Sequence, residues 1–107
     1  MLKLRGEFES RRVWLNDIEL HIEDSLKARN HSPTGFGWSY AGSGPSQLAL
    51  AICLRLFKKE FAMAHYQNLK WDLIATLPPS DFSIDFDIGA WARRVSGLSW
   101  TSWCEKK

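Results

Sequence analysis

The sequence predicts an α+β fold in which an N-terminal antiparallel β-hairpin or meander packs on about three helices, with the central helix buried. Three observations predict it: apolar and charged residues alternate near the start, a nearly all-apolar run occupies 47–57, and amphipathic helical patterns follow that run. Alternation is typical of half-buried strands, whereas an apolar run without a polar face is typical of a buried helix. The length of 107 residues suits one domain, which we take to span 1–107.

The strands are expected first. Residues 2–8 alternate, and so do 11–15 and 18–23, which are separated by Asn16 and Asp17. Asn and Asp tolerate the positive φ that a two-residue hairpin turn requires. The resulting register places four apolar residues on one face, pairing Leu15 with Ile18 and Val13 with Leu20.

The opposite face of this hairpin carries a mixed set of side chains: Arg12, Trp14, Glu19 and His21. We expect His21 to lie across from Arg12 as an ordinary strand residue without a metal or catalytic role.

The segment 24–34 is predicted to be a loop. It carries charged residues and contains Pro33, which lacks a backbone N–H donor and restricts the preceding residue to extended conformations. Residues 36–40 alternate aromatic and small side chains and predict a short strand or an extended segment packed on the core.

Helices are expected after this segment. Pro45 suits the first position of a helix, and the run 47–57 carries Arg55 as its single charge. A second, amphipathic helix is predicted over 61–77 and is stopped by the two prolines that follow it.

The last part of the chain predicts a short strand at 82–84 and a third helix. Asp85 or Asp87 would cap this helix, and Gly97 would end it. Its inward stripe is expected to contain Ile88, Trp91, Ala92 and Val95.

Charge and cysteine content exclude several classes. The net charge is +2 with interleaved signs, which favours neither a duplex-binding domain nor a mimic of nucleic acid. We expect no disulfide between Cys53 and Cys104, because small disulfide scaffolds usually carry more cysteines. The absence of an apolar signal segment and of a membrane-length run predicts a cytoplasmic protein.

A glycine-rich turn before the apolar run is the candidate ligand loop. Backbone N–H groups at such a turn can hold an anion, but this turn lacks the lysine of a phosphate loop and Pro45 deletes one donor. A structural turn is therefore the favoured interpretation. A nucleophilic role for Ser32, which follows His31, is disfavoured because no orienting carboxylate is recognisable. The residues of this candidate loop are His31, Ser32, Gly42, Ser43, Gly44 and Gln47.

No cofactor or metal is expected. The three histidines His21, His31 and His65 are far apart in sequence, and the two cysteines do not form a Cys-x-x-Cys pair. No catalytic residues are assigned, and an enzyme is disfavoured.

Six tryptophans are many for this length, and Trp and Arg commonly anchor protein interfaces. We expect Trp38, Trp71 and Trp91 in the core. The candidate partner-binding residues are Arg93, Arg94, Trp100 and Trp103. They favour a non-enzymatic interaction protein. The alternative is a nucleic-acid-binding accessory protein in which Lys58 and Lys59 join the two arginines.

The segment 31–51, HSPTGFGWSYAGSGPSQLALA, resembles the signature of an uncharacterised family of small proteins of bacteria, plasmids and phages. The likeness continues through Tyr66 to Lys70, the Leu77-Pro78 pair, and Ile88 to Trp91. The resemblance implies a domain of unknown function and supplies no catalytic residues. By analogy with small phage proteins it implies an inhibitor of a host defence complex, similar to anti-CRISPR proteins.

Overall fold

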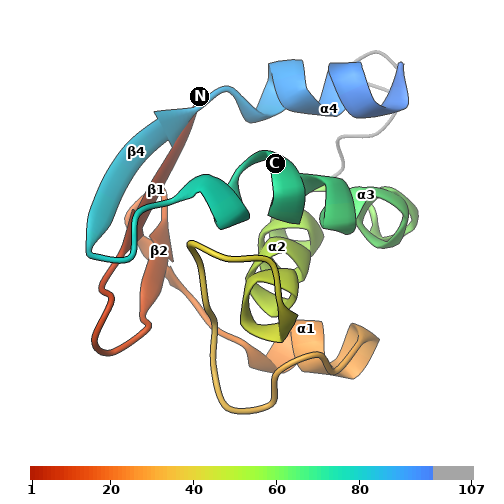
Figure 1. Ribbon diagram of the computed structural model, residues 1–107. Helices are drawn as coiled ribbons and strands as arrows, with labels where there is room; N and C mark the ends of the chain where they lie inside the picture. The colour runs from red at the N-terminus through yellow and green to blue at the C-terminus, as the bar shows by residue number, and fades with distance from the viewer. Residues whose placement is uncertain (98–107) are drawn as a thin grey trace.

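A four-stranded antiparallel sheet with the strand order β3-β2-β1-β4 carries helices on one side (Figure 1). The computed structural model describes residues 1–97. The strands are β1 (Leu2–Gly6), β2 (Val13–Leu15), β3 (Ile18–Leu20) and β4 (Phe82–Phe86). The helices are α1 (Glu23–Ala28), α2 (Ser43–Leu56), α3 (Lys59–Asp72), the 3-10 helix η1 (Ile74–Thr76) and α4 (Ile88–Ser96). The predicted α+β class is confirmed.

The hairpin of β2 and β3 has the predicted turn and register. Asn16 and Asp17 have φ values of 51° and 69°, as a type I′ turn requires. Leu15 lies opposite Ile18 and Val13 opposite Leu20. The side chain of Ile18, on the edge strand β3, is nevertheless 57% exposed, whereas Leu15 opposite it is buried.

The prediction for His21 was wrong. The residue follows the end of β3 and is exposed, so it does not pair across from Arg12. The guanidinium of Arg12 instead binds the carboxylate of Glu19, with Nε and Nη2 each 3.0 Å from a carboxylate oxygen.

The prediction of a loop over 24–34 was wrong for its first part, because α1 occupies Glu23–Ala28. Two acidic residues in its first turn and Lys27 in its last turn suit the helix dipole, and Ser25 donates a hydrogen bond to the carbonyl of Ile22. So short a helix is marginal alone, and here it packs on α2. Pattern analysis misses it because the stabilising contacts lie elsewhere in the chain.

The central helix α2 is buried, as predicted. All of its residues from Gly44 to Cys53 are buried, and the helix packs against α1, α3 and η1. Pro45 is the third residue of the helix, not the first as predicted. It still removes no helical hydrogen bond, because the N–H groups of the first turn have no partner within a helix.

The predicted second helix 61–77 is shorter: α3 ends at Asp72 and η1 follows. The predicted strand at 82–84 extends to Phe86 as β4 and pairs with β1. Asp87 caps α4 by accepting a hydrogen bond from the N–H of Ala90, and Gly97 ends the helix with a φ of 71°.

Within residues 1–97, no helix has the length and apolar character needed to cross a membrane.

Residues 36–38 belong to no strand, and Ser39, with a φ of 77°, and Tyr40 form a bend. Trp38 is fully buried, and its ring centroid lies 5.9 Å from that of Phe8 and 5.1 Å from that of Phe82. Its indole N–H donates to the carbonyl of Ser80 at 3.2 Å. This one side chain therefore joins the N-terminal strands, the middle of the chain and β4.

Candidate functional site

The glycine-rich turn at the start of α2 is packed against the segment before it. A Cβ on Gly44 would lie 3.0 Å from the backbone nitrogen of Gly37 and 3.0 Å from the hydroxyl oxygen of Tyr40. A Cβ on Gly42 would lie 2.7 Å from the ring of the same tyrosine. Protein atoms therefore occupy the space beside this turn, which favours the structural interpretation over an anion-binding loop.

Gln47 fixes the loop that precedes this turn. Its side chain is fully buried, and its carbonyl oxygen accepts hydrogen bonds from the N–H groups of His31 and Ser32 at 2.7 and 3.0 Å. Its amide group donates to the hydroxyl of Ser25 at 2.8 Å and to the carbonyl of Arg29 at 3.0 Å. All hydrogen-bonding positions of this amide are used within the protein. We expect Gln47 to hold structure and not a ligand.

His31 is the one residue of the candidate loop that combines partial exposure with a titratable group. Its Nε2 atom and the hydroxyl oxygen of Tyr66 are 2.7 Å apart. Burial, with the positive charges of Arg29 and Lys70, lowers the pKa of His31 below its ordinary value. The ring is therefore mostly neutral at pH 7 and can accept the hydrogen bond of the tyrosine.

Nucleophilic chemistry has little support at this loop. The hydroxyl of Ser32 donates to the carbonyl of Gly35 at 2.8 Å and not to a base. Burial raises the pKa of the Cys53 thiol and keeps it protonated in the core. Across the first 97 residues, no three His, Cys, Asp or Glu side chains come together in a way that would hold a metal ion.

Two large aromatic side chains, one on α3 and one in the segment before α2, are exposed to solvent. Trp71 on α3 is 61% exposed and Tyr40 is 52% exposed. The amine of Lys70 lies 4.9 Å from the centre of the Trp71 ring. The N–H of Ser39 donates to the carbonyl of Ile74, which ties the segment carrying Tyr40 to η1, just after the end of α3. We call Tyr40, Lys70 and Trp71 the aromatic surface.

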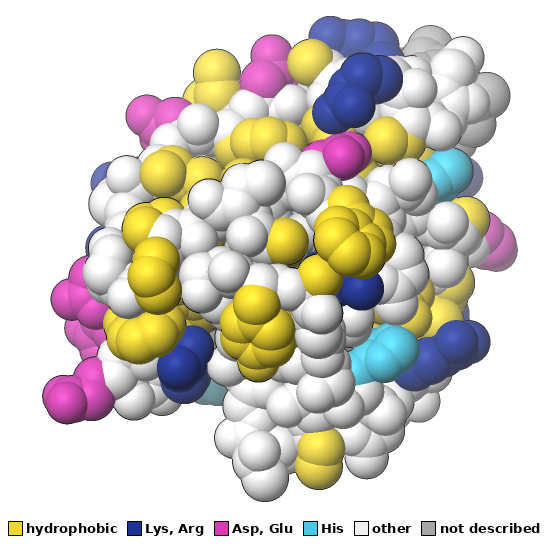
Figure 2. Space-filling view, in the orientation of Figure 1, with side chains coloured by type: hydrophobic (Ala, Val, Ile, Leu, Met, Phe, Trp, Pro, Cys, Tyr) yellow, Lys and Arg dark blue, Asp and Glu magenta, His cyan; other side chains and the backbone are white. Residues whose placement is uncertain are grey.

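Figure 2 shows this face of the molecule. Hydrophobic side chains stand out over the start of α2 and the end of α3, with a basic side chain and a histidine beside them. The expectation that Trp71 belongs to the core was wrong, whereas Trp38 and Trp91 are buried as expected. The helical period contained the signal, because Leu69 and Leu73 point inward and position 71 between them lies about 200° away from each.

The predicted partner-binding residues are partly described. Arg93 and Arg94 lie exposed in the last turn of α4, and a guanidinium nitrogen of Arg94 lies 3.6 Å from the carboxylate of Asp72. The same carboxylate accepts the indole N–H of Trp91 at 3.0 Å. Trp100 and Trp103 lie outside the described residues.

The basic residues of the nucleic-acid alternative are spread over the surface. Lys58 and Lys59 lie at the start of α3, whereas Arg94 contacts Asp72 at its end. Lys59 and Asp72 are thirteen positions apart on the helix, which corresponds to about 20 Å along the axis. These residues therefore form no single short basic stripe.

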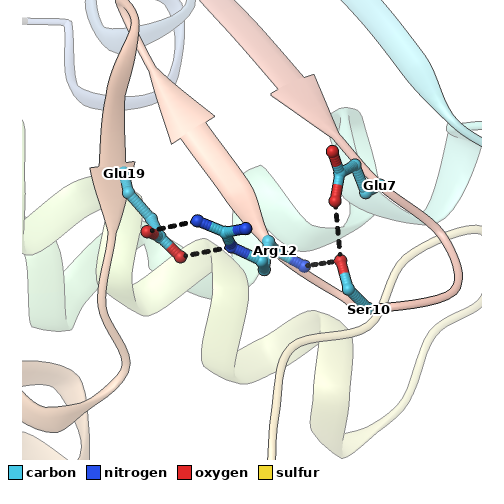
Figure 3. Close-up of polar contacts among 4 residues, drawn as sticks. All are labelled: Glu7, Ser10, Arg12 and Glu19. Carbon is cyan, nitrogen blue, oxygen red and sulfur yellow. Dashed lines mark hydrogen bonds and ion pairs between the residues drawn. The ribbon is translucent and has the colours of Figure 1, made fainter.

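The outer face of the sheet holds a network of charged groups (Figure 3). The pKa of Glu19 is lowered, first by its hydrogen bond with Arg12. The backbone N–H of Arg12 donates to the hydroxyl of Ser10, which in turn donates to Glu7. Trp14 lies on this face with the guanidinium of Arg5 3.9 Å from its ring centre and that of Arg12 at 5.0 Å.

Comparison with known proteins identifies a family and no activity. No curated protein and no solved structure matches the chain. The family described as a family of unknown function, DUF6166, matches residues 4–94, which include β2, β3, β4 and most of β1 and of α4. This agrees with the resemblance to an uncharacterised family noted in the sequence. The chain therefore belongs to the DUF6166 family.

Proposed function

We propose that this chain is a non-enzymatic protein-interaction module that binds its partner through the aromatic surface. One observation carries the proposal: Trp71 is 61% exposed on a helix, with Lys70 held beside its ring. Trp and Tyr are enriched among the residues that contribute most to protein binding. An aromatic ring on a helix loses little conformational entropy on binding.

The packing of the neighbouring loop supports this proposal. The four hydrogen bonds of Gln47 and the contact between His31 and Tyr66 hold the segment from 29 to 32 against α2 and α3. Gly37 and Gly44 pack closely behind Tyr40. The surface is therefore preorganised.

The class of partner follows from the resemblance of residues 31–51 to small proteins of bacteria, plasmids and phages. Small phage proteins often bind and block host defence complexes, so we propose a protein of such a complex, for example a CRISPR effector, as the first partner to test. This step rests on analogy.

The test uses a photo-crosslinking amino acid, p-benzoylphenylalanine, placed at position 71 or at position 18 in the host cell. Ile18 is a matched control because it is 57% exposed on the hairpin, away from the aromatic surface. We expect a discrete crosslinked species from position 71 and none from position 18.

Affinity for the crosslinked protein then tests the role of the ring. Trp71→Ala should weaken binding by at least about tenfold, whereas Ile18→Ala should leave it unchanged. The proposal is wrong if position 71 gives no discrete species or if Trp71→Ala binds as the parent chain does. Binding of a labelled single-stranded oligonucleotide that weakens as salt rises would favour the nucleic-acid alternative instead.

A further inference from the structure

Strand β4 lies at an open edge of the sheet. It pairs with β1 on one side, and no described strand pairs with its other side. Figure 1 shows this edge facing away from the helices. Five alternating residues with an unpaired side form a template to which another extended segment can add.

The register identifies the backbone groups that this edge presents. The N–H of Glu7 donates to the carbonyl of Arg12, so the odd-numbered residues of β1 direct their backbone groups toward β2. The even-numbered residues of β1 therefore face β4, where Leu4 lies opposite Ile84. It follows that the N–H and C=O groups of Ser83 and Asp85 point away from the sheet.

The side chains of the strand add an apolar and an acidic component. Ile84 and Phe86 are half-buried on the inner face, so an added strand can cover more of them. Asp81, Asp85 and Asp87 are exposed along the strand and its two flanking residues. The edge strand is therefore apolar on its face toward the helices and negatively charged where it is exposed to solvent.

A hollow of about 340 Å³ lies beside the start of β4 on the outer face. Its lining includes the acidic residues Glu7 and Asp81, whose carboxylates accept hydrogen bonds from Ser10 and from the N–H of Phe8, together with Ser83 and Arg5. The guanidinium of Arg5 lies over the ring of Trp14 on β2, so it is directed away from β4. A basic side chain opposite Ser83 would reach this hollow and meet the two carboxylates.

The lysine nearest to Asp85 does not neutralise it. Lys3 lies opposite Asp85 in the register, but its amine lies 3.4 Å from the carboxylate of Asp17 at the hairpin turn. The negative charge of Asp85 therefore remains available to a cation on an added strand.

A second copy of the chain is a poor occupant of this edge. Antiparallel pairing of two β4 strands centred on Ile84 places Asp81 of one copy opposite Asp87 of the other. Centring on Ser83 places Asp85 opposite Asp81, and centring on Asp85 places two Asp85 side chains opposite each other. Like charges directly opposite one another are destabilising, so each of these registers is disfavoured.

We propose that the free edge of β4 binds an extended peptide segment of a partner protein in which basic residues alternate with apolar ones. The basic residues lie opposite Ser83 and Asp85 on the outer face, and the apolar residue between them covers Ile84 on the inner face. Backbone hydrogen bonds supply the pairing, and charge complementarity selects the sequence. This surface differs from the aromatic surface, and the proposal does not depend on the function proposed above.

The first test is NMR titration of the 15N-labelled chain with the capped peptide Thr-Lys-Val-Lys-Val-Lys-Thr. Its control is the same peptide with Glu in place of each Lys. We expect the amide protons of Ser83 and Asp85 to exchange rapidly with solvent in the free chain and to become protected by the basic peptide. The basic peptide should bind about tenfold more tightly than the acidic one at low salt, and the difference should shrink as salt rises.

Two variants test the geometry. Ser83→Pro removes an N–H that faces outward, so the fold should persist while peptide binding is lost. Asp85→Asn should weaken binding of the basic peptide several-fold, whereas the matched variant Asp24→Asn on α1 should not.

Four results of the peptide experiments would overturn the proposal. These are no peptide binding at millimolar concentration, protection confined to other residues, equal binding of both peptides, and full binding by a folded Ser83→Pro variant. A dimer in sedimentation that Ser83→Pro dissociates would assign the edge to a second copy and would also overturn it. Failure here leaves the Trp71 experiment unaffected, since the two surfaces share no residue.

Discussion

Replacing Gln47 with leucine should test the most connected polar side chain of the described fold. The substitution keeps a side chain of similar size but removes four hydrogen bonds, to three backbone groups and the hydroxyl of Ser25. Each is worth about 1 kcal/mol when its partner is left unsatisfied. Since His31 and Ser32 are half-buried and water can reach part of this loop, we expect a loss of about 3 kcal/mol in the free energy of unfolding.

Urea denaturation followed by circular dichroism measures this loss, and a thermal scan should show a Tm lower by roughly 10–15 °C. The control is Gln67→Leu, which removes a single 3.4 Å hydrogen bond from Ser46 and should cost about 0.5 kcal/mol or less. A loss below about 1 kcal/mol for Gln47→Leu, with an unchanged m-value, would refute the reasoning, because the amide would then not be holding the loop.

Three further predictions concern single positions. Gly44→Ala should destabilise the fold by about 1–3 kcal/mol in urea denaturation because its Cβ would meet the opposing backbone, whereas Gly35→Ala has open space around it and should be nearly neutral; equal stability of the two variants would contradict the close packing. Since the pKa of His31 is lowered in the folded chain, its contribution to stability should be complete above the unfolded pKa of about 6.5 and decrease as the pH falls toward the folded pKa. Stability measured from pH 7.5 to 5 should therefore fall less in His31→Asn than in the parent chain, and an identical fall would count against the shift. In a Cys104→Ser variant, the remaining Cys53 should react with a thiol reagent at the rate of unfolding or local opening, and immediate reaction in the native state would be inconsistent with its burial.

Local chemistry explains why the hairpin and α2 could be predicted. Asn16 and Asp17 adopt positive φ by themselves, and the alternation around them specifies a single register. The apolar run of α2 has no polar face, so burial follows from composition alone. Neither inference needed knowledge of distant residues.

The parts that were missed depend on contacts between segments. The short helix α1 forms where it packs on α2, and pairing of β4 with β1 joins segments almost eighty residues apart. Gln47 was predicted to be part of a candidate ligand loop, but its four partners lie 15 to 22 residues earlier in the chain. No sequence pattern specifies such partners. The exposure of Trp71, in contrast, was available from the helical period.

Pairing of Leu2 with Phe86 has a consequence for how the chain folds during synthesis. One edge of β1 cannot be covered until residues 82–86 have left the ribosome, because β4 is the last strand within residues 1–97. The nascent hairpin of β2 and β3 can form early, while β1 remains a site for mispairing with other chains. Closure of the sheet is thus a late, non-local step, and a chain interrupted before residue 82 would lack the strand that completes it.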